Sequence, residues 1–385
     1  MKICLGITRL KGDLTEAISK NFYNLSEELV NQGHQVTSLS PVKIQAPTKS
    51  RQVIYSKEHS YESKAMVLKN IKRLGRFIKK YQDRFDAIHI HAGFLLEAYL
   101  LNKYLKDIKK PVFITIWQPH LEKKEFFRSI NLLFKRPKDY LYHFTLNSFL
   151  PKGFFSKKIK NTYTNIIVSS EYQKNQLKNL PIQVIPNGLK ESELKQKIKD
   201  KPAPEILYIG HFTPFKGTES LIEAVKHTKK KYPQTKLTLA WSGYGSKKRI
   251  TNLLNKYKLQ DNVILKNKIE VYEELVKNDF LIIPYQSTIG TSHYHNVLIE
   301  AMSTGTPILA SRLGSIPEIV IDKKTGIFIN PKKPMEIAKA ITQTFENKEL
   351  RSEISKNSIK LFQNKFLVKN VAKQHIDLYN GRGKS

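Results

Sequence analysis

Short apolar runs alternate with longer amphipathic stretches along most of the chain. In the first half, the runs cover residues 3–7, 36–39, 87–90, 112–117, 166–169 and 183–185. In the second half, they cover residues 206–209, 237–240, 263–265, 280–283, 308–310 and 326–329. Short apolar runs that alternate with amphipathic stretches are typical of strands in a parallel sheet. The pattern therefore predicts an α/β fold built from repeated strand–helix units.

The stretches between these runs carry helical patterns. Between the first two runs, four apolar residues recur at helical spacing and a glycine follows as a stop signal: Ile18, Phe22, Leu25, Leu29 and Gly33. In the second half, helices are expected to begin near Gly217, Lys247, Val271, Asn296 and Pro317. From Met335 to about Tyr379 the chain is predicted to be helical, and a polar tail follows.

A chain of 385 residues is too long for one ordinary core and fits two domains. The polar segment 190–205, which contains Pro202 and Pro204, has the composition of a linker. The expected division is a first Rossmann-like domain over 1–189, a second over 190–365, and a final helix and tail over 366–385. We expect the two domains to face each other across a cleft and the final helix to cross back to the first domain.

Lysine and arginine outnumber aspartate and glutamate by 66 to 33, which gives a formal net charge of +33. Such a charge repels itself unless an anionic partner lies nearby, so nucleic acid, an anionic membrane and phosphorylated substrates are the candidate partners. Cys4 is the only cysteine, which excludes an internal disulfide and a cysteine-rich metal site. The first residues read as a strand rather than a signal peptide, and no apolar stretch approaches the length of a spanning helix. A cytoplasmic protein with at most peripheral membrane contact is expected.

Two segments mix basic residues with apolar and aromatic ones. Residues 120–160 interrupt the strand–helix alternation, and residues 64–80 carry lysines and arginines beside an apolar stripe of Val67, Ile71, Leu74 and Ile78. Such a mixture fits the headgroup boundary of a membrane, and the expected contacts there are Arg128, Lys135, Arg136 and Lys138. Single-stranded nucleic acid would also bind such a surface by stacking and charge. The chain has no recognisable nucleic-acid motif, so the inner face of an anionic membrane is the favoured partner.

The most specific chemical signal lies over residues 290–305. A glycine-containing loop precedes a predicted helix that begins at Asn296 and stops at Gly305. The free N–H groups at the start of such a helix form a natural diphosphate site. Glu300 lies about one turn in, where its two carboxylate oxygens are placed to accept hydrogen bonds from the paired hydroxyls of a ribose. The expected nucleotide-binding residues are Gly290, Thr291, Ser292, Asn296, Val297 and Glu300.

A second phosphate-binding signal follows the run at 206–209. Lys216 stands at the head of a predicted helix, after Gly210 and immediately before Gly217. A lysine in this position places a positive charge on a diphosphate. In a lysine-rich protein an isolated lysine is usually a surface residue, but its place between the two glycines favours a functional role.

Six motifs, in one order along the chain, resemble those of the family-4 glycosyltransferases, a large group of retaining enzymes with the GT-B fold. Residues 296–310, followed by 314–318 and 325–326, are similar to the carboxy-terminal signature of that family. The other motifs that resemble the family lie at residues 33–36, 86–91, 185–188, 206–211 and 216–217.

The resemblance implies that a sugar is moved from a nucleoside diphosphate sugar to an acceptor, with retention of the anomeric configuration and without a metal ion or other cofactor. It implies that Glu300 binds the ribose, and that Gly210, His211, Lys216 and the residues from Ser292 to Val297 bind the diphosphate. Gly12 is also assigned to the donor, and His120 to catalysis beside Lys216, His211 and Ser292. The acceptor, a lipid-linked sugar or a glycan, is expected to enter from the first domain.

The chain departs from the family pattern at three positions. Ser292 stands where the family has a glutamate, His211 where it has an arginine, and Trp117 where it has a histidine. Serine brings no charge, and histidine is a weaker, pH-dependent cation than arginine. These departures leave an inactive GT-B scaffold that binds a polyanion, such as nucleic acid or membrane lipid, as the competing hypothesis.

The histidines occur in two alternating pairs that invite a metal interpretation, His89 with His91 and His293 with His295. No cluster of acidic residues accompanies either pair, and the sequence has no Asp-x-Asp motif. Structural or hydrogen-bonding roles are therefore predicted for them. The family resemblance implies that His91 lies beneath the floor of the active site.

Overall fold

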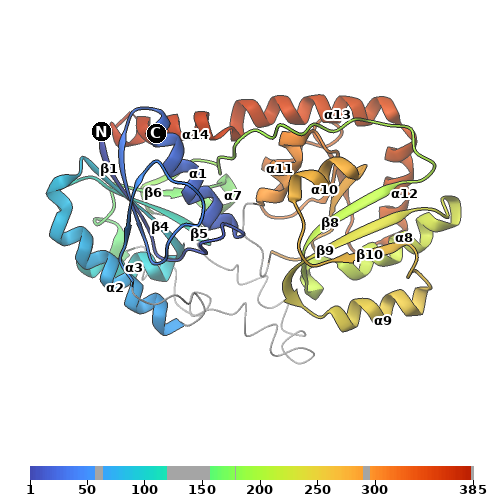
Figure 1. Cartoon of the computed structure of the whole chain (residues 1–385), viewed down its shortest axis with the longest axis horizontal. Helices are drawn as coiled ribbons and strands as arrows, with labels where there is room; N and C mark the ends of the chain where they lie inside the picture. The colour runs from blue at the N-terminus through green and yellow to red at the C-terminus, as the bar shows by residue number, and fades with distance from the viewer. Residues whose placement is uncertain (57–63, 119–156, 178, 289–294, 383–385) are drawn as a thin grey trace.

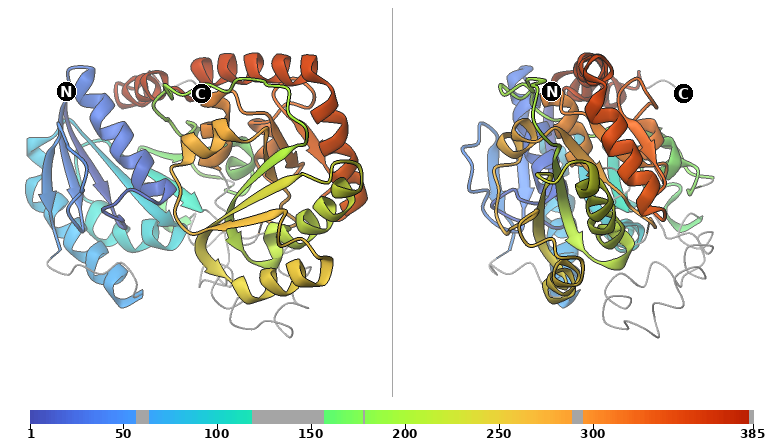
Figure 2. Two further views of the ribbon diagram at one scale, coloured as in Figure 1. Left: turned by 45° about the vertical axis from the view of Figure 1, so that its right-hand side comes forward. Right: turned by 90° about the vertical axis from the view of Figure 1, so that its right-hand side faces the viewer.

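The computed structural model describes residues 1–56, 64–118, 157–177, 179–288 and 295–382. Over these residues the chain forms two parallel β-sheets, each flanked by helices (Figure 1). Each sheet and its helices form a separate α/β domain, and the two domains lie side by side along the long axis of the molecule (Figures 1 and 2). The prediction of two Rossmann-like domains is confirmed.

The first sheet has seven strands in the order β3-β2-β1-β4-β5-β6-β7. Its strands are β1 (Lys2–Ile7), β2 (Gln35–Ser40), β3 (Arg51–Ile54), β4 (Ala87–Phe94), β5 (Val112–Gln118), β6 (Asn165–Val168) and β7 (Ile182–Val184). The helices described beside it are α1 (Ala17–Asn31), α2 (Lys64–Tyr81), α3 (Leu95–Leu105) and the short α7 (Glu171–Lys174). All neighbouring strands pair in parallel, which matches the continuous apolar runs of the sequence.

The second sheet has six parallel strands in the order β10-β9-β8-β11-β12-β13. Its strands are β8 (Glu205–Phe212), β9 (Lys236–Gly245), β10 (Val263–Lys266), β11 (Phe280–Ile283), β12 (Ile308–Ser311) and β13 (Ile327–Ile329). Its helices are α8 (Thr218–Lys231), α9 (Lys247–Tyr257), α10 (Val271–Lys277), α11 (Asn296–Thr304), α12 (Pro334–Glu346) and α13 (Lys348–Leu361). One large apolar cluster joins this sheet to its helices.

Two elements differ from the pattern-based prediction. Strand β3 was not predicted, because its first two residues, Arg51 and Gln52, are polar and leave only Val53 and Ile54 as apolar residues. The helix expected near Pro317 is wrong as a full helix, since the chain makes only one 3₁₀ turn over Ile316–Glu318. Glu318 turns its carboxylate to the first domain instead of continuing the turn.

The chain crosses between the domains twice, along the same edge of the molecule. The outward crossing follows β7 and the return runs through the π-turn Phe362–Phe366 into α14 (Val368–Tyr379), and the two lie side by side (Figure 1). Backbone hydrogen bonds join them: Leu189 N donates to Phe366 O at 2.9 Å, and Val368 N donates to Leu189 O at 2.9 Å. Ala372 and Tyr379 of α14 are buried in the core of the first sheet. The last helix therefore belongs, by its packing, to the first domain, as predicted.

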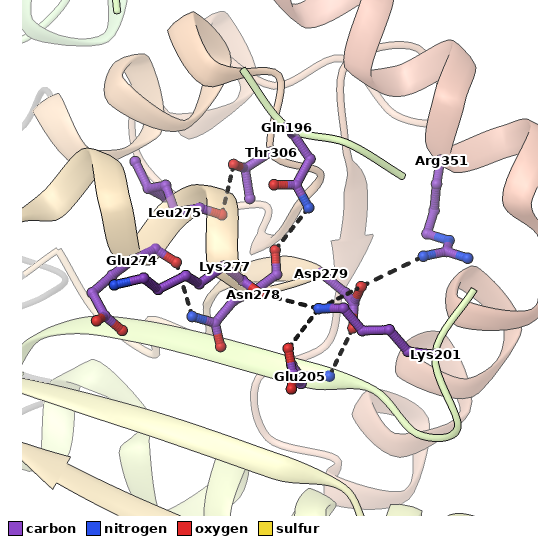
Figure 3. A network of polar contacts seen from close by, with 10 residues as sticks. All are labelled: Gln196, Lys201, Glu205, Glu274, Leu275, Lys277, Asn278, Asp279, Thr306 and Arg351. Atoms are coloured by element: carbon purple, nitrogen blue, oxygen red, sulfur yellow. Dashed lines mark hydrogen bonds and ion pairs between the residues drawn. The ribbon is translucent and has the colours of Figure 1, made fainter. Parts of the chain in front are cut away.

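A buried polar network fastens the outward linker to the second domain (Figure 3). Asp279, at the start of β11, accepts from Glu205 N at 2.8 Å, and its carboxylate lies 3.4 Å from Lys201 Nζ and 3.7 Å from Arg351 Nη1. Asp279 and Arg351 are 2% and 3% exposed. Burial raises the pKa of Asp279, while its partners Glu205 N, Lys201 and Arg351 act in the opposite direction. The network ties the linker, β8, β11 and α13 together at one corner.

Asp279→Ala should lower the free energy of unfolding by about 3 kcal/mol, because it leaves the guanidinium of Arg351 buried without its acidic partner. Urea denaturation followed by circular dichroism measures the change. Asp261→Ala, at an exposed aspartate of the same domain, is the control and should change stability by about 0.5 kcal/mol or less. An Asp279→Ala variant as stable as the control would show that the network contributes nothing to folding.

The apolar stripe of α2 is not available to a membrane. Ile71, Leu74 and Ile78 are fully or almost fully buried in the core of the first domain, and Val67 packs against the same cluster. The prediction that this stripe forms a membrane-binding face is therefore wrong, because helical spacing alone does not tell a core face from a lipid-facing one. What α2 exposes is a basic face with Leu68, Lys72, Arg76, Lys79 and Lys80.

Candidate functional site

The first turns of α1 and α11 meet between the domains. Helix α1 follows the carboxyl end of β1, and α11 lies in the connection from β11 to β12 of the second sheet. In parallel α/β sheets, ligands bind at the carboxyl ends of the strands. Contacts between these two helices therefore mark the region where the ligand edges of the two sheets face each other.

Glu300 lies one turn into α11 and is paired with a lysine of the other domain. Its Oε1 lies 2.5 Å from Nζ of Lys20, and the Glu300 and Lys20 side chains are 7% and 29% exposed. The ammonium group of Lys20 also lies 5.2 Å from the centroid of the Tyr272 ring. Burial alone lowers the pKa of Lys20, but the Glu300 carboxylate and then Tyr272 raise it above the ordinary lysine value. Lys20 is therefore a charged partner of a largely desolvated carboxylate.

Asn296, the first residue of α11, is hydrogen-bonded to two asparagines of the first domain. Its Oδ1 accepts from Asn21 Nδ2 at 3.0 Å and from Asn187 Nδ2 at 2.9 Å. Asn187 in turn accepts from Ser169 Oγ at 3.0 Å. Asn296 and Glu300 are four residues apart, so they share one face of the helix. That face is the one turned to α1, while Val297 is half-buried beside it.

Helix α11 itself is built to be rigid. Leu298, Ile299, Ala301 and Met302 are fully buried, so the helix is anchored on the sheet. It ends at Gly305, whose φ of 77° is the left-handed conformation that favours glycine at a helix end. The first turn of α11, in which the N–H of Leu298 donates to the His295 carbonyl at 3.1 Å, is thereby held at the domain junction.

The strand β8 carries Gly210 and His211 at its carboxyl end, where the pairing with β9 is irregular. The imidazole Nδ1 of His211 lies 2.6 Å from the hydroxyl of Ser242, and the His211 carbonyl accepts from the Tyr208 hydroxyl at 2.7 Å. His211 is half-buried. The irregular pairing lies at the carboxyl end of β8, the edge at which parallel α/β sheets bind ligands.

Lys216 ends a 3₁₀ turn over Pro214–Lys216 and is only 4% exposed. Its Nζ lies 3.9 Å from the centroid of the Tyr285 ring. Burial lowers the pKa of Lys216 to about 7, from an ordinary value of 10.5. A buried amine with a pKa near neutrality becomes fully charged when an anion binds beside it.

Gly217 positions Lys216 and the start of α8. Its φ is 67°, and a Cβ at this position would lie 1.9 Å from the carbonyl oxygen of Pro284. Only glycine therefore fits where the loop after β8 passes the loop after β11. This is the physical reason for the Lys-Gly pair that the sequence contains.

The structure describes only part of the predicted site. His120, Gly290, Thr291, Ser292 and the basic residues Arg128, Lys135, Arg136 and Lys138 lie outside the described residues, as does most of the segment 120–160. Gly12 lies in the loop between β1 and α1, and its carbonyl accepts from Gln45 N at 2.9 Å. A Cβ on Gly12 would lie 2.5 Å from the carbonyl oxygen of Lys43, so the loop packs closely there.

The buried histidines His89, His91 and His375 pack with Tyr379 in an aromatic layer of the first domain. His89 lies 2.6 Å from the Tyr379 hydroxyl through Nδ1 and 2.7 Å from Thr115 Oγ1 through Nε2. The imidazole of His91 has no hydrogen-bond partner within the described part of the chain, and burial, followed by His375, lowers its pKa to about 3. His91 lines a small cavity together with Trp117 and Asn187. Across the ranges that the structure describes, no three histidine, cysteine or acidic side chains are grouped to hold a metal.

The pattern of the sequence does not identify the contacts that cross between the domains. Lys20 and Asn21 fall between the apolar positions of α1 and read as solvent-facing residues. Glu318 accepts from the backbone N–H groups of Glu171 and Tyr172 at 2.8 and 2.7 Å, which caps α7 of the first domain. No sequence periodicity identifies such pairs, because the partners come from different domains.

Comparisons with known proteins agree with this architecture. The family model described as "Glycosyl transferases group 1" matches residues 190–361, and the family model described as "Glycosyltransferase Family 4" matches residues 19–193. An uncharacterized glycosyltransferase of Methanocaldococcus jannaschii is 25% identical over 288 residues, which is 73% of this chain and 71% of that protein. The glycogen synthase of Mycobacterium tuberculosis is 26% identical over 174 residues, 43% of this chain and 40% of that protein.

Solved structures share the fold. Sucrose-phosphate synthase from Thermosynechococcus elongatus superposes with a TM-score of 0.74 at 19% identity, covering 99% of both chains. Anabaena HepE in complex with UDP-glucose superposes with a TM-score of 0.71 at 14% identity, covering 99% of this chain and 100% of that one. The architecture is that of a GT-B glycosyltransferase. The chain belongs to the group 1, family 4 glycosyltransferases, whose two family models together match most of its length.

None of the helices over the described residues is long and apolar enough to cross a membrane.

Proposed function

We propose that the protein transfers a sugar from a nucleoside diphosphate sugar, the donor, to an acceptor hydroxyl with retention of the anomeric configuration. The observation that carries this proposal is the position of Glu300. Its carboxylate is largely buried, lies one turn into α11 and faces the junction of the domains. A carboxylate in this place accepts two hydrogen bonds from the paired ribose hydroxyls, and the start of α11 receives the diphosphate.

Lys216 and His211 supply the positive charge that the reaction needs. As the bond between the anomeric carbon and the β-phosphate oxygen breaks, negative charge grows on the leaving diphosphate. The acceptor oxygen then bonds to the anomeric carbon, and its proton leaves with the diphosphate or the solvent. Groups aimed at the leaving oxygens act most strongly in the transition state, because that is where the charge develops. Closing of the domains would exclude water and limit hydrolysis of the donor.

A uridine nucleotide is the first donor class to test. HepE of Anabaena has been solved with UDP-glucose, and TarM of S. aureus with UDP. A nucleotide that binds only the folded protein raises its melting temperature. We expect one family of nucleotide sugars, with UDP-sugars first, to give the largest shift in a thermal-shift panel.

Slow donor hydrolysis tests the enzymatic step without an identified acceptor. The donor that shifts the melting temperature should release its nucleoside diphosphate at a measurable rate, and EDTA should leave that rate unchanged. A protein that releases none across the panel, and instead binds single-stranded nucleic acid tightly, would support the polyanion-binding scaffold. A rate abolished by EDTA would contradict catalysis without a metal.

We further propose that the acceptor is lipid-linked and that the first domain meets it at an anionic membrane surface. The support is the net charge of +33 and the basic exposed face of α2, in which Lys72, Arg76 and Lys80 are all exposed. Each lysine or arginine near an anionic leaflet contributes about 1 kcal/mol. Several such residues are sufficient for reversible, salt-sensitive docking.

Replacing Lys72, Arg76 and Lys80 by glutamine should weaken co-sedimentation with phosphatidylserine vesicles about a hundredfold at low salt, since three charges of about 1 kcal/mol each are removed. The matched control replaces Lys230, Lys356 and Lys360, which are exposed on α8 and α13 of the second domain. The control should bind vesicles as the parent protein does. Equal loss in both variants would mean that net charge, rather than the α2 face, determines binding. The same assay applies to Arg128, Lys135, Arg136 and Lys138.

A further inference from the structure

Lys20 and Asn21 of the first domain cover the face of α11 that carries Asn296 and Glu300. Lys20 pairs with Glu300 at 2.5 Å, and Asn21 donates to Asn296 at 3.0 Å. Two successive residues of α1 thus contact the two positions of α11 that lie one turn apart. In the ribbon, α1 slants with its first turn toward the second domain (Figures 1 and 2).

The Glu300 carboxylate requires a partner in every state of the protein. It is 7% exposed, and within the described residues Lys20 is the only side chain that pairs with it. A buried carboxylate without a partner is costly, whereas one that exchanges a lysine for two ribose hydroxyls remains satisfied. A carboxylate oxygen can accept more than one hydrogen bond, so the competition is for the space beside Oε1, which Lys20 Nζ occupies at 2.5 Å.

We propose that Lys20 is a residue of the donor site that competes with the nucleotide ribose for Glu300. This inference rests on the proposed role of Glu300 as the ribose-binding carboxylate. Donor binding displaces the ammonium group of Lys20 from Glu300. The affinity for the donor is therefore set by a residue of the first domain as well as by the second domain.

The pair also has the features of a partner that can be released. Lys20 is 29% exposed, so its ammonium group can turn to solvent on a flexible side chain. The Tyr272 ring, 5.2 Å from Nζ, provides a second favourable contact that does not involve the carboxylate. A ligand shifts such an equilibrium only by its different affinity for the two states, and here the difference is the occupation of Glu300.

A double-mutant cycle in UDP binding tests the proposal. Calorimetry would compare the parent protein with Lys20→Met, Glu300→Gln and the double variant, using UDP as the probe, or GDP if GDP gives the larger thermal shift. Removing Lys20 also removes positive charge near an anionic nucleotide, but this general effect is similar in both backgrounds and cancels in the cycle. The quantity compared is the ratio of UDP affinities with and without Lys20→Met. We expect this ratio to be about tenfold higher when Glu300 is intact than in the Glu300→Gln background.

Further variants identify the competing group and exclude a folding effect. With 2′-deoxy-UDP as the probe, the tenfold coupling should shrink, because one of the hydroxyls that displaces Lys20 is missing. Lys20→Arg should restore the parent behaviour more closely than Lys20→Met. Lys190→Met is the matched control, because Lys190, like Lys20, has its ammonium group over a tyrosine ring. Its Nζ lies 5.5 Å from the centroid of Tyr23, and it is not placed at the donor site. Melting temperatures of all variants show that each is folded.

The outcomes separate this inference from the proposed function. If Glu300→Gln leaves UDP affinity unchanged, the role of Glu300 itself is wrong and the proposal for Lys20 falls with it. If Glu300→Gln weakens UDP binding but Lys20→Met has the same effect in both backgrounds, only the competition is wrong. If Lys20→Met weakens UDP binding more when Glu300 is intact, Lys20 supports the donor rather than competing with it, which also overturns the proposal.

Discussion

Replacing Lys216 by alanine should reduce turnover of the donor about 10²- to 10³-fold, the range found when one group that stabilises transition-state charge is removed. Lys216 is 4% exposed and held by the turn before Gly217, so no water-exposed lysine can take its place without rearrangement. Release of nucleoside diphosphate measures the effect. Lys226→Ala is the matched control, because Lys226 also lies over a tyrosine ring, 4.9 Å from the centroid of Tyr257, but on the exposed side of α8. Full activity in Lys216→Ala would mean that this lysine does not contact the diphosphate.

The lowered pKa of Lys216 adds a pH signature to this prediction. With a pKa of about 7, the amine is largely neutral at pH 8 and charged at pH 6. An anionic diphosphate beside it favours the charged form, so UDP binding at pH 8 should take up a proton that binding at pH 6 does not require. Calorimetry in two buffers with different ionisation enthalpies measures this uptake. It should be absent in Lys216→Met.

The same shift determines how Lys216 affects folding stability. Between about pH 7 and pH 10.5 the amine is protonated in the unfolded chain but largely neutral in the folded one. The unfolded state therefore binds more protons, and the stability of the parent protein relative to Lys216→Met should rise with pH across this window. A difference that falls with rising pH would contradict the assigned pKa.

Replacing Glu300 by glutamine should weaken UDP binding by about 1.5–3 kcal/mol, because the charge-assisted hydrogen bonds to the ribose are lost while the shape is kept. Calorimetry measures the change directly. Glu274→Gln is the matched control: Glu274 is 6% exposed and pairs with Lys266 at 2.6 Å within the second domain, so it shares the burial and the lysine partner but not the position in α11. Its UDP affinity should remain that of the parent. A Glu300→Gln variant with unchanged affinity would remove this carboxylate from the nucleotide site.

Much of the fold was predictable because its determinants are local. Each predicted run became a strand of one of the two sheets, because short apolar runs between amphipathic stretches are a local signal of parallel strands. Gly217 and Gly305 were readable as element boundaries because glycine favours the positive φ that both adopt. Strand β3 was missed because half of it, Arg51 and Gln52, is polar.

The candidate site was only partly readable. Glu300 and Lys216 stood out because they occupy special places in a strand–loop–helix pattern, which is a local feature. Their environments were not readable: the lowered pKa of Lys216 comes from burial by distant segments, and the partner of Glu300 comes from a residue 280 positions away. The apolar stripe of α2 was readable but was assigned to the wrong surroundings, because the same helical spacing is found on a core face and on a membrane-binding face.

The sequence by itself determined the two α/β units, the glycine turns and the positions of the nucleotide-binding signals, because these depend on spacing along one segment. Only the tertiary structure decided which residues meet between the units. Lys20 with Glu300, Asn21 with Asn296 and Glu318 with the start of α7 each join segments from different domains. Such contacts depend on how two folded bodies pack, and that packing is set by the return of α14 into the first core rather than by any local pattern.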